Sequence, residues 1–137
     1  MTIPEVWELC ADDSCVSPDT YEPERSRERV WLGVYEGIAM IGMIYVHAQN
    51  SSTIQMHPYL LKGYKHKIRD VMKLFFAWAF AMPEIHKVNV TVPFIYQKLR
   101  NCCLKAGFKD EGVNRMSYRK NSEIVDQWHM GAVRGEV

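Results

Sequence analysis

Hydrophobic side chains recur at steps of three and four residues from position 68 to position 82, and this period is typical of an amphipathic helix. Before it, residues 53–56 are β-branched and apolar, which predicts a short strand that His57-Pro58 ends. The connection between them, residues 60–67, is basic and contains Gly63. The expected apolar face of the helix consists of Ile68, Val71, Met72, Phe75, Ala79 and Met82.

This connection is the first candidate for a binding site. A strand that leads through a glycine-containing basic turn into a helix presents free backbone N–H groups and the positive end of the helix dipole. Such a geometry suits a phosphate group. The same pattern is also typical of an ordinary strand-to-helix connection with a solvated run of charges, and both interpretations stay open.

Alternating patterns between residues 30 and 107 predict three further strands and a second helix. Residues 30–35 and 38–47 form strands around a tight turn at Glu36-Gly37, and Gly42 favours a bulge in the second of them. With residues 53–56 they make an antiparallel meander. Residues 86–92 form another strand, after which Pro93 opens a helix that Gly107 ends. Its inner face is expected to carry Ile95, Leu99, Cys102 and Ala106.

The two ends of the chain complete the predicted order of elements. Residues 108–120 and 123–134 read as a hairpin joined at Asn121-Ser122. At the N-terminus, Thr2, Pro4 and Glu5 have the form of a helix start, and residues 17–29 are a loop or a loosely held second helix. This order predicts an α/β (α+β) domain with one mixed sheet flanked by helices.

Composition limits the function classes. The 137 residues suffice for one domain, residues 1–137, and their 47% hydrophobic and 24% charged side chains are typical of a folded protein. A formal net charge of +1 makes nucleic acid an unlikely partner, so any phosphate site must be local. No window is long and apolar enough to span a membrane, and the first residues are not a signal peptide.

The four cysteines, Cys10, Cys15, Cys102 and Cys103, show no metal-binding spacing, so no metal site is predicted. Without a disulfide pattern, the chain is expected to be a reduced, cytoplasmic protein with buried thiols.

Several of these segments resemble the GNAT (Gcn5-related N-acetyltransferase) superfamily over residues 30–134. The likeness rests on Lys105-Ala-Gly-Phe-Lys-Asp-Glu-Gly-Val113, on Tyr118-Arg-Lys-Asn121, on Val125-Asp-Gln-Trp-His-Met130 and on the meander Trp31-Leu-Gly-Val-Tyr-Glu-Gly-Ile-Ala-Met-Ile-Gly42. The resemblance implies a mixed, mostly antiparallel sheet flanked by helices, with the first strand of the family reduced or absent. It also implies acetyl-CoA as a weakly bound cofactor.

The resemblance further assigns the cofactor-binding residues. The motif [Gln/Arg]-x-x-Gly-x-[Gly/Ala] of the family aligns with residues 60–65, where Gly63 is present but Leu60 and Lys65 depart from the pattern. Main-chain groups of Ile54, Gln55 and Met56 would bind the pantetheine arm. The pyrophosphate would lie at the helix start, on Lys62, Gly63, Tyr64, Lys65 and His66.

Two catalytic residues follow. The tyrosine that protonates the departing thiolate in the family lies four residues before the Gly-Phe glycine, and Cys103 stands there. A general base should lie near the strand of residues 53–56, where His57 is preferred over His47 and Glu36 because it closes the strand at the cleft side and because imidazole titrates near neutral pH. A purely structural His57 at a strand end remains the alternative.

The first functional hypothesis is therefore an acetyl-CoA-dependent N-acetyltransferase that transfers an acetyl group directly to an amine. The alternative is a catalytically inactive GNAT-fold protein resembling small bacteriophage proteins, a virion structural or assembly component with a protein partner, located in the host cytoplasm or the virion. Trp31, Trp78 and Trp128 read as core anchors. The aromatic excess of residues 75–80 also leaves a homodimer open.

Overall fold

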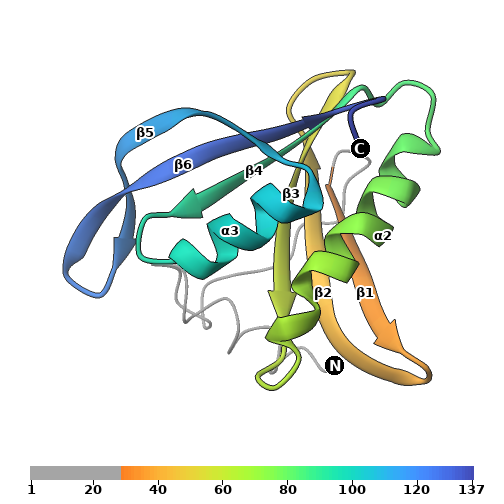
Figure 1. Cartoon of the computed structure of the whole chain (residues 1–137), viewed down its shortest axis with the longest axis horizontal. Coiled ribbons are helices and arrows are strands. Elements are labelled where there is room, and N and C mark those ends of the chain that lie inside the picture. The colour runs from red at the N-terminus through yellow and green to blue at the C-terminus, as the bar shows by residue number, and fades with distance from the viewer. Residues whose placement is uncertain (1–28) are drawn as a thin grey trace.

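The computed structural model describes residues 29–137. The predicted N-terminal helix, residues 17–28, Cys10 and Cys15 lie outside the described residues. Both described helices pack on the same side of a six-stranded sheet (Figure 1). The strands lie in the order β1-β2-β3-β4-β6-β5. Their bounds are β1 Arg29–Glu36, β2 Ala39–Ala48, β3 Thr53–Leu60, β4 Lys87–Pro93, β5 Lys109–Lys120 and β6 Glu123–Val133.

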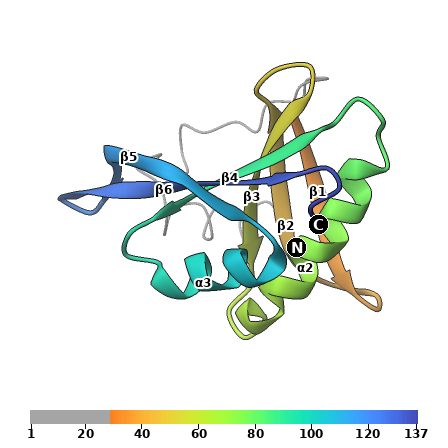
Figure 2. The ribbon, with the colours of Figure 1, turned by 45° about the horizontal axis from the view of Figure 1, so that its top comes forward.

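The described sheet is mixed and mostly antiparallel, which confirms the expected fold class. Its one parallel pair is β3 with β4, and all other neighbours are antiparallel. In Figure 2 the strands β1, β2 and β3 run almost upright while β4, β5 and β6 run across the view. The sheet therefore consists of two halves that diverge from the β3–β4 pair.

The β1–β2 hairpin follows the prediction closely. Gly37 adopts a φ of +59° in the tight turn, a conformation that glycine reaches without strain. The bulge lies beside Gly42 rather than at it, because Val34 pairs with Gly42 and Tyr35 with Met40, which leaves Ile41 without a partner opposite. Gly42 itself is needed for another reason, since a side chain there would collide with the backbone of β3.

Strand β3 is longer than predicted, because it continues through His57-Pro58 to Leu60. The Leu61 N–H donates to the Ile41 C=O at 2.9 Å, which makes odd-numbered β3 residues the hydrogen-bonded partners of β2. Pro58 therefore turns its missing N–H away from β2, toward a side where none of the described strands pairs with it. The prediction that His57-Pro58 ends the strand was wrong, because proline is tolerated on an edge.

The predicted helix of residues 68–82 is the short 3₁₀ turn η1 (Lys65–Lys67) followed by α2 (Ile68–Phe80). The predicted apolar residues that belong to α2 are all buried, and Met82 packs against the core just beyond the end of the helix. Fully buried Met72 of α2 belongs to the same core as Met56 of β3 and Val88 of β4. The helix thus covers the sheet as its period predicted.

The second predicted helix, α3, spans Gln97–Ala106 and starts later than expected. Pro93 is instead the final residue of β4. Cys103 and Ala106 are the buried residues of α3, whereas Ile95 precedes the helix and is 45% exposed. The prediction of the inner face was therefore wrong at Ile95, and Cys103 takes the buried position that was expected for Cys102. Gly107 ends the helix as predicted, with a φ of +121°.

A single arginine closes the far end of α2. The Arg134 guanidinium donates to the carbonyl oxygens of Phe80 at 2.9 Å, of Met82 at 2.7 Å and of Ile85 at 2.6 Å. Its carbon lies 5.2 Å from the centre of the Phe80 ring. The Phe80 carbonyl at the end of α2 has no intrahelical donor, and Met82 and Ile85 follow the helix, so Arg134 joins the end of α2 and the segment after it to the end of β6.

We expect Arg134→Gln to lower the free energy of unfolding by about 2–3 kcal/mol, since hydrogen bonds to a charged group contribute roughly 1.5–3 kcal/mol each and glutamine keeps part of the set. Urea denaturation measures the loss. Arg115→Gln removes an equal charge from an exposed position of β5 and should cost little. Similar losses in the two variants would contradict the assigned role.

Candidate functional site

Strands β3 and β4 part after three paired positions. The pairs are Thr53 with Lys87, Ile54 with Val88 and Gln55 with Asn89. Beyond them β3 continues along β2 to Leu60, and β4 continues along β6 to Pro93. The two carboxyl ends therefore diverge, and in sheets containing parallel strands the space beyond these ends is where ligands bind.

Side chains hold the point of divergence on the face away from α2. Gln49 Nε2 donates to Gln55 Oε1 at 2.6 Å, and Asn89 Nδ2 donates to Gln49 Oε1 at 2.7 Å. Gln55 Nε2 lies 3.3 Å from Thr91 Oγ1 on β4. This amide network ties β3 to β4 at their last pair and fixes where the opening starts.

A cavity of about 970 Å³ lies at the opening, at the upper end of the roughly 300–1,000 Å³ usual for ligand pockets. Its walls come from the end of β3, from the start of the η1–α2 helix, from the residues around the start of α3 and from the end of β5. The lining residues are Pro58, Tyr59, Leu60, Lys65, His66, Ile68, Ile95, Tyr96, Gln97, Lys98, Leu99, Cys102 and Lys120.

The β3 wall offers backbone groups. Even-numbered β3 residues direct their main-chain N–H and C=O groups away from β2, as the Leu61–Ile41 bond requires. Beyond the last β4 pair, this leaves the carbonyls of Pro58 and Leu60 and the N–H of Leu60 facing the opening, whereas fully buried Met56 does not line it. An extended ligand with amide groups could pair with this edge as a strand would.

The helix wall offers donors. Lys67 N–H donates to Tyr64 C=O at 3.0 Å, and Ile68 N–H donates to Lys65 C=O. The N–H groups of Lys65 and His66 come before these first helical bonds, and both residues line the cavity. The N-terminus of a helix with N–H groups of this kind binds anions.

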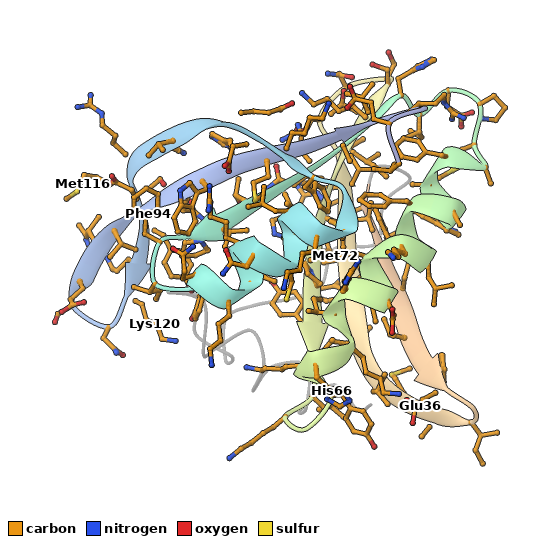
Figure 3. The ribbon with its side chains drawn as sticks, in the orientation of Figure 1. Glu36, His66, Met72, Phe94, Met116 and Lys120 are labelled. Atoms are coloured by element: carbon orange, nitrogen blue, oxygen red, sulfur yellow. The ribbon has the colours of Figure 1, made fainter. Side chains whose placement is uncertain are left out.

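The cavity has a positive electrostatic character. Lys65, Lys98 and Lys120 line it, and none of the described lining residues is Asp or Glu. Lys120 Nζ donates to the Tyr96 hydroxyl at 2.6 Å and lies 5.0 Å from the centre of that ring. Figure 3 shows His66 beside the start of α2 and Lys120 beyond the start of α3, on two sides of the site. Such a site favours an anionic ligand.

Comparison with solved structures finds acetyltransferases. A chimera of the spermidine N-acetyltransferase SpeG from Vibrio cholerae and hSSAT has a TM-score of 0.73 at 15% identity, covering 78% of this chain and 68% of that one. SpeG from Vibrio cholerae in complex with CoA and spermine has a TM-score of 0.67 at 17% identity, covering 72% and 60%. A probable acetyltransferase has a TM-score of 0.73 at 19% identity, covering 81% and 64%.

The chain has the GNAT acetyltransferase fold. It spans about two thirds of the length of these acetyltransferases. No family model and no curated protein sequence matches it.

Within this GNAT fold, the predicted cofactor-binding residues fall into three groups. Lys65 and His66 line the cavity, while Lys62, Gly63 and Tyr64 lie in the connection just before them and outside the lining. Ile54 and Gln55 lie where β3 and β4 are still paired, and Met56 is fully buried in the core.

Sequence analysis missed the α3 side of the cavity. Tyr96, Lys98 and Cys102 line it from the residues around and within that helix, and Lys120 reaches it from the end of β5. The sequence did contain a signal for Tyr96 and Lys98, because they follow the second strand of the parallel pair, whose carboxyl end adjoins the site. Lys120 carried none, since only the tertiary structure brings the hairpin back to Tyr96.

The predicted base His57 lies on the other face of β3, since side chains alternate along a strand. Its ring centre is 5.2 Å from that of His47 and 5.5 Å from that of Tyr45. Burial, together with the positive charge that His47 can carry, lowers the pKa of His57 to about 4. His57 is therefore neutral at physiological pH. Glu36, one of the two other candidates, is ion-paired with Lys67.

The predicted acid Cys103 is fully buried in the core of the GNAT fold and does not line the cavity. Burial, with a smaller effect of the neighbouring Cys102, raises the pKa of its thiol to about 12. Cys102, one residue earlier and half-buried, forms part of the cavity wall.

No three His, Cys, Asp or Glu side chains gather as metal ligands would anywhere in residues 29–137. No helix in that range has the length and apolar character that crossing a membrane requires.

The lowered pKa of His57 predicts loss of stability in acid. The unfolded chain takes up a proton near pH 6.5 and the folded chain only near pH 4, so stability falls as pH drops between these values. We expect about 2 kcal/mol less stability at about pH 5 than at about pH 7 from this group. His57→Gln should remove this increment in urea denaturation at the two pH values.

The exposed His86 provides the control for this measurement, because His86→Gln should leave the pH dependence as it is. An acid sensitivity that is unchanged in His57→Gln would show that other groups cause it.

Proposed function

We propose that this protein binds acetyl-CoA in the cavity between β3 and α3 and transfers its acetyl group to an amine. The observation that carries the proposal is the divergence of β3 from β4 beside a cavity with three lysines and, among the described lining residues, no carboxylate. The structural similarity to SpeG, one structure of which contains CoA and spermine, supports it.

The residues present suit the parts of this cofactor. The N–H groups of Lys65 and His66 at the helix start, with the Lys65 ammonium, suit the pyrophosphate. The edge of Pro58 and Leu60 suits the amides of the pantetheine arm, and none of the predicted residues Ile54, Gln55 and Met56 lines the cavity. Leu60, Ile68 and Leu99 supply apolar surface along the same path.

Acetyl-CoA would supply an acetyl group activated as a thioester. The chain would supply orientation, and neutral His57 would accept a hydrogen bond from the attacking amine on the far face of β3. A base with a pKa of about 4 holds a proton only briefly and would pass it to water. The Cys103 thiol keeps its proton because its pKa is raised, so the proposed reaction takes the proton for the thiolate from solvent.

The second candidate is a GNAT-fold protein that binds the cofactor without turning it over. The low pKa of His57 and the buried Cys103 favour it, because neither predicted catalytic group is well suited to proton transfer at neutral pH. The acetyltransferases named above give no support for a bacteriophage role. Binding without acetylation of any amine tested would favour this candidate over the enzyme.

Cys102 provides a direct test of occupancy. In a Cys10→Ser, Cys15→Ser background, N-ethylmaleimide should alkylate Cys102, and saturating acetyl-CoA should slow this reaction about tenfold or more because the ligand covers the cavity wall. Mass spectrometry of the peptides measures the rate. The buried Cys103 serves as the internal control and should stay unmodified in the folded protein.

Equal alkylation rates with and without acetyl-CoA would overturn the proposed binding site. Adenosine at the same concentration should not protect, since it lacks the phosphates and the arm.

Gly63 lies in the connection that leads into the cavity wall, so its backbone conformation should affect ligand binding. Its φ of +94° is unfavourable for other residues. Gly63→Val should therefore shift the start of η1 and weaken the binding of acetyl-CoA about tenfold, since a strained backbone costs about 1–3 kcal/mol. Calorimetric titration measures this. Gly135→Val introduces the same substitution at a similar φ, +88°, near the C-terminus, and should leave the affinity unchanged. Equal affinities of Gly63→Val and Gly135→Val for acetyl-CoA would exclude the connection of residues 60–67 as the phosphate site.

A further inference from the structure

The cavity carries cationic groups at two separate places. One is the start of the η1–α2 helix, with Lys65 and His66. The other is the start of α3, where Lys98 stands in the first turn and Lys120 reaches in from the hairpin. A single phosphate could occupy only one of them. The arrangement therefore fits a ligand with two separated anionic groups.

Lys98 has no carboxylate to neutralise it among the described residues. The four ion pairs found there, Lys67–Glu36, Lys87–Glu111, Arg100–Asp110 and Lys109–Glu136, do not include it. Helix α3 contains no acidic residue, and no side chain caps its first N–H groups. The ammonium and the helix dipole both favour an anion at this place.

The neighbouring lysine is held in position. The hydrogen bond to the Tyr96 hydroxyl and the contact with the Tyr96 ring fix the Lys120 ammonium at the same end of the cavity as Lys98. Tyr96 is uncharged when it accepts this bond, so the bond does not cancel the positive charge. The α3 end thus offers two lysines from different elements.

We propose that Lys98, together with Lys120, binds the ribose 3′-phosphate of CoA and makes the protein select CoA over dephospho-CoA. This inference rests on the proposed function. The pyrophosphate would occupy the other cationic place, at Lys65 and His66, and the 3′-phosphate is the remaining charged group of the cofactor. Selection would arise because a phosphate brings about two negative charges to a place where every charged side chain among the described lining residues is cationic.

Isothermal titration calorimetry with CoA and with dephospho-CoA tests the proposal. We expect the wild-type chain to bind CoA about tenfold more tightly than dephospho-CoA, the effect of roughly one charge-assisted hydrogen bond. Lys98→Gln should reduce this ratio to about two or less, because it should weaken the binding of CoA much more than that of dephospho-CoA. Added salt should also narrow the wild-type ratio.

Lys105→Gln is the matched control, because Lys105 carries the same charge on the same helix but does not line the cavity. It should keep the wild-type ratio. Equal binding of both ligands to the wild type, or equal weakening of both in Lys98→Gln, would overturn the assignment of the 3′-phosphate while leaving the proposed function intact. Failure of both ligands to bind the wild type would overturn the proposed function as well.

Discussion

The separation of β3 from β4 after Gln55 is the constraint on which the rest of this structure depends. A strand inside a sheet bonds its N–H and C=O groups on both edges, and a free edge must be satisfied in another way. Strand β3 keeps β2 as a partner to Leu60 but loses β4 after the Asn89 pair. Pro58 lacks one of the donors that the opening would otherwise leave unpaired. The groups that remain are a row of carbonyls with the Leu60 N–H, which a ligand can use.

Two guanidinium groups tie the walls of the opening to the distal half of the sheet. Arg134, just after β6, holds the end of α2 through three carbonyls. Arg100 of α3 pairs with Asp110 of β5 and lies 4.8 Å from the centre of the Trp128 ring on β6. Both helices are therefore anchored to the β5–β6 side of the sheet.

The sequence correctly predicted those features that the local pattern of residues determines. The helical period of residues 68–82 and the Gly107 stop appear as expected, because burial of one face and a positive φ are local requirements. The predictions failed where a neighbouring element of the fold determines the local structure. His57-Pro58 reads as a strand end only if β4 is assumed to lie alongside, and Cys103 rather than Cys102 is buried because the packing of α3 on the core sets its rotation. For the same reason half of the site was found, from Lys65 and His66, while Tyr96, Lys98 and Lys120 depend on tertiary contacts.

The two faces of β3 separate binding from proton chemistry. Pro58 and Leu60 line the cavity with its lysines, whereas His57 lies behind the strand in a cluster with His47 and Tyr45. His57 follows Gln55 by two residues, just beyond the Gln55–Thr91 hydrogen bond, where β3 and β4 have already parted. There the imidazole keeps its lone pair free at every physiological pH, because its pKa is about 4, but for the same reason it retains a proton poorly. The proposed anion site thus consists of lysines and helix-start N–H groups, whereas the proposed base lies on the opposite face of β3.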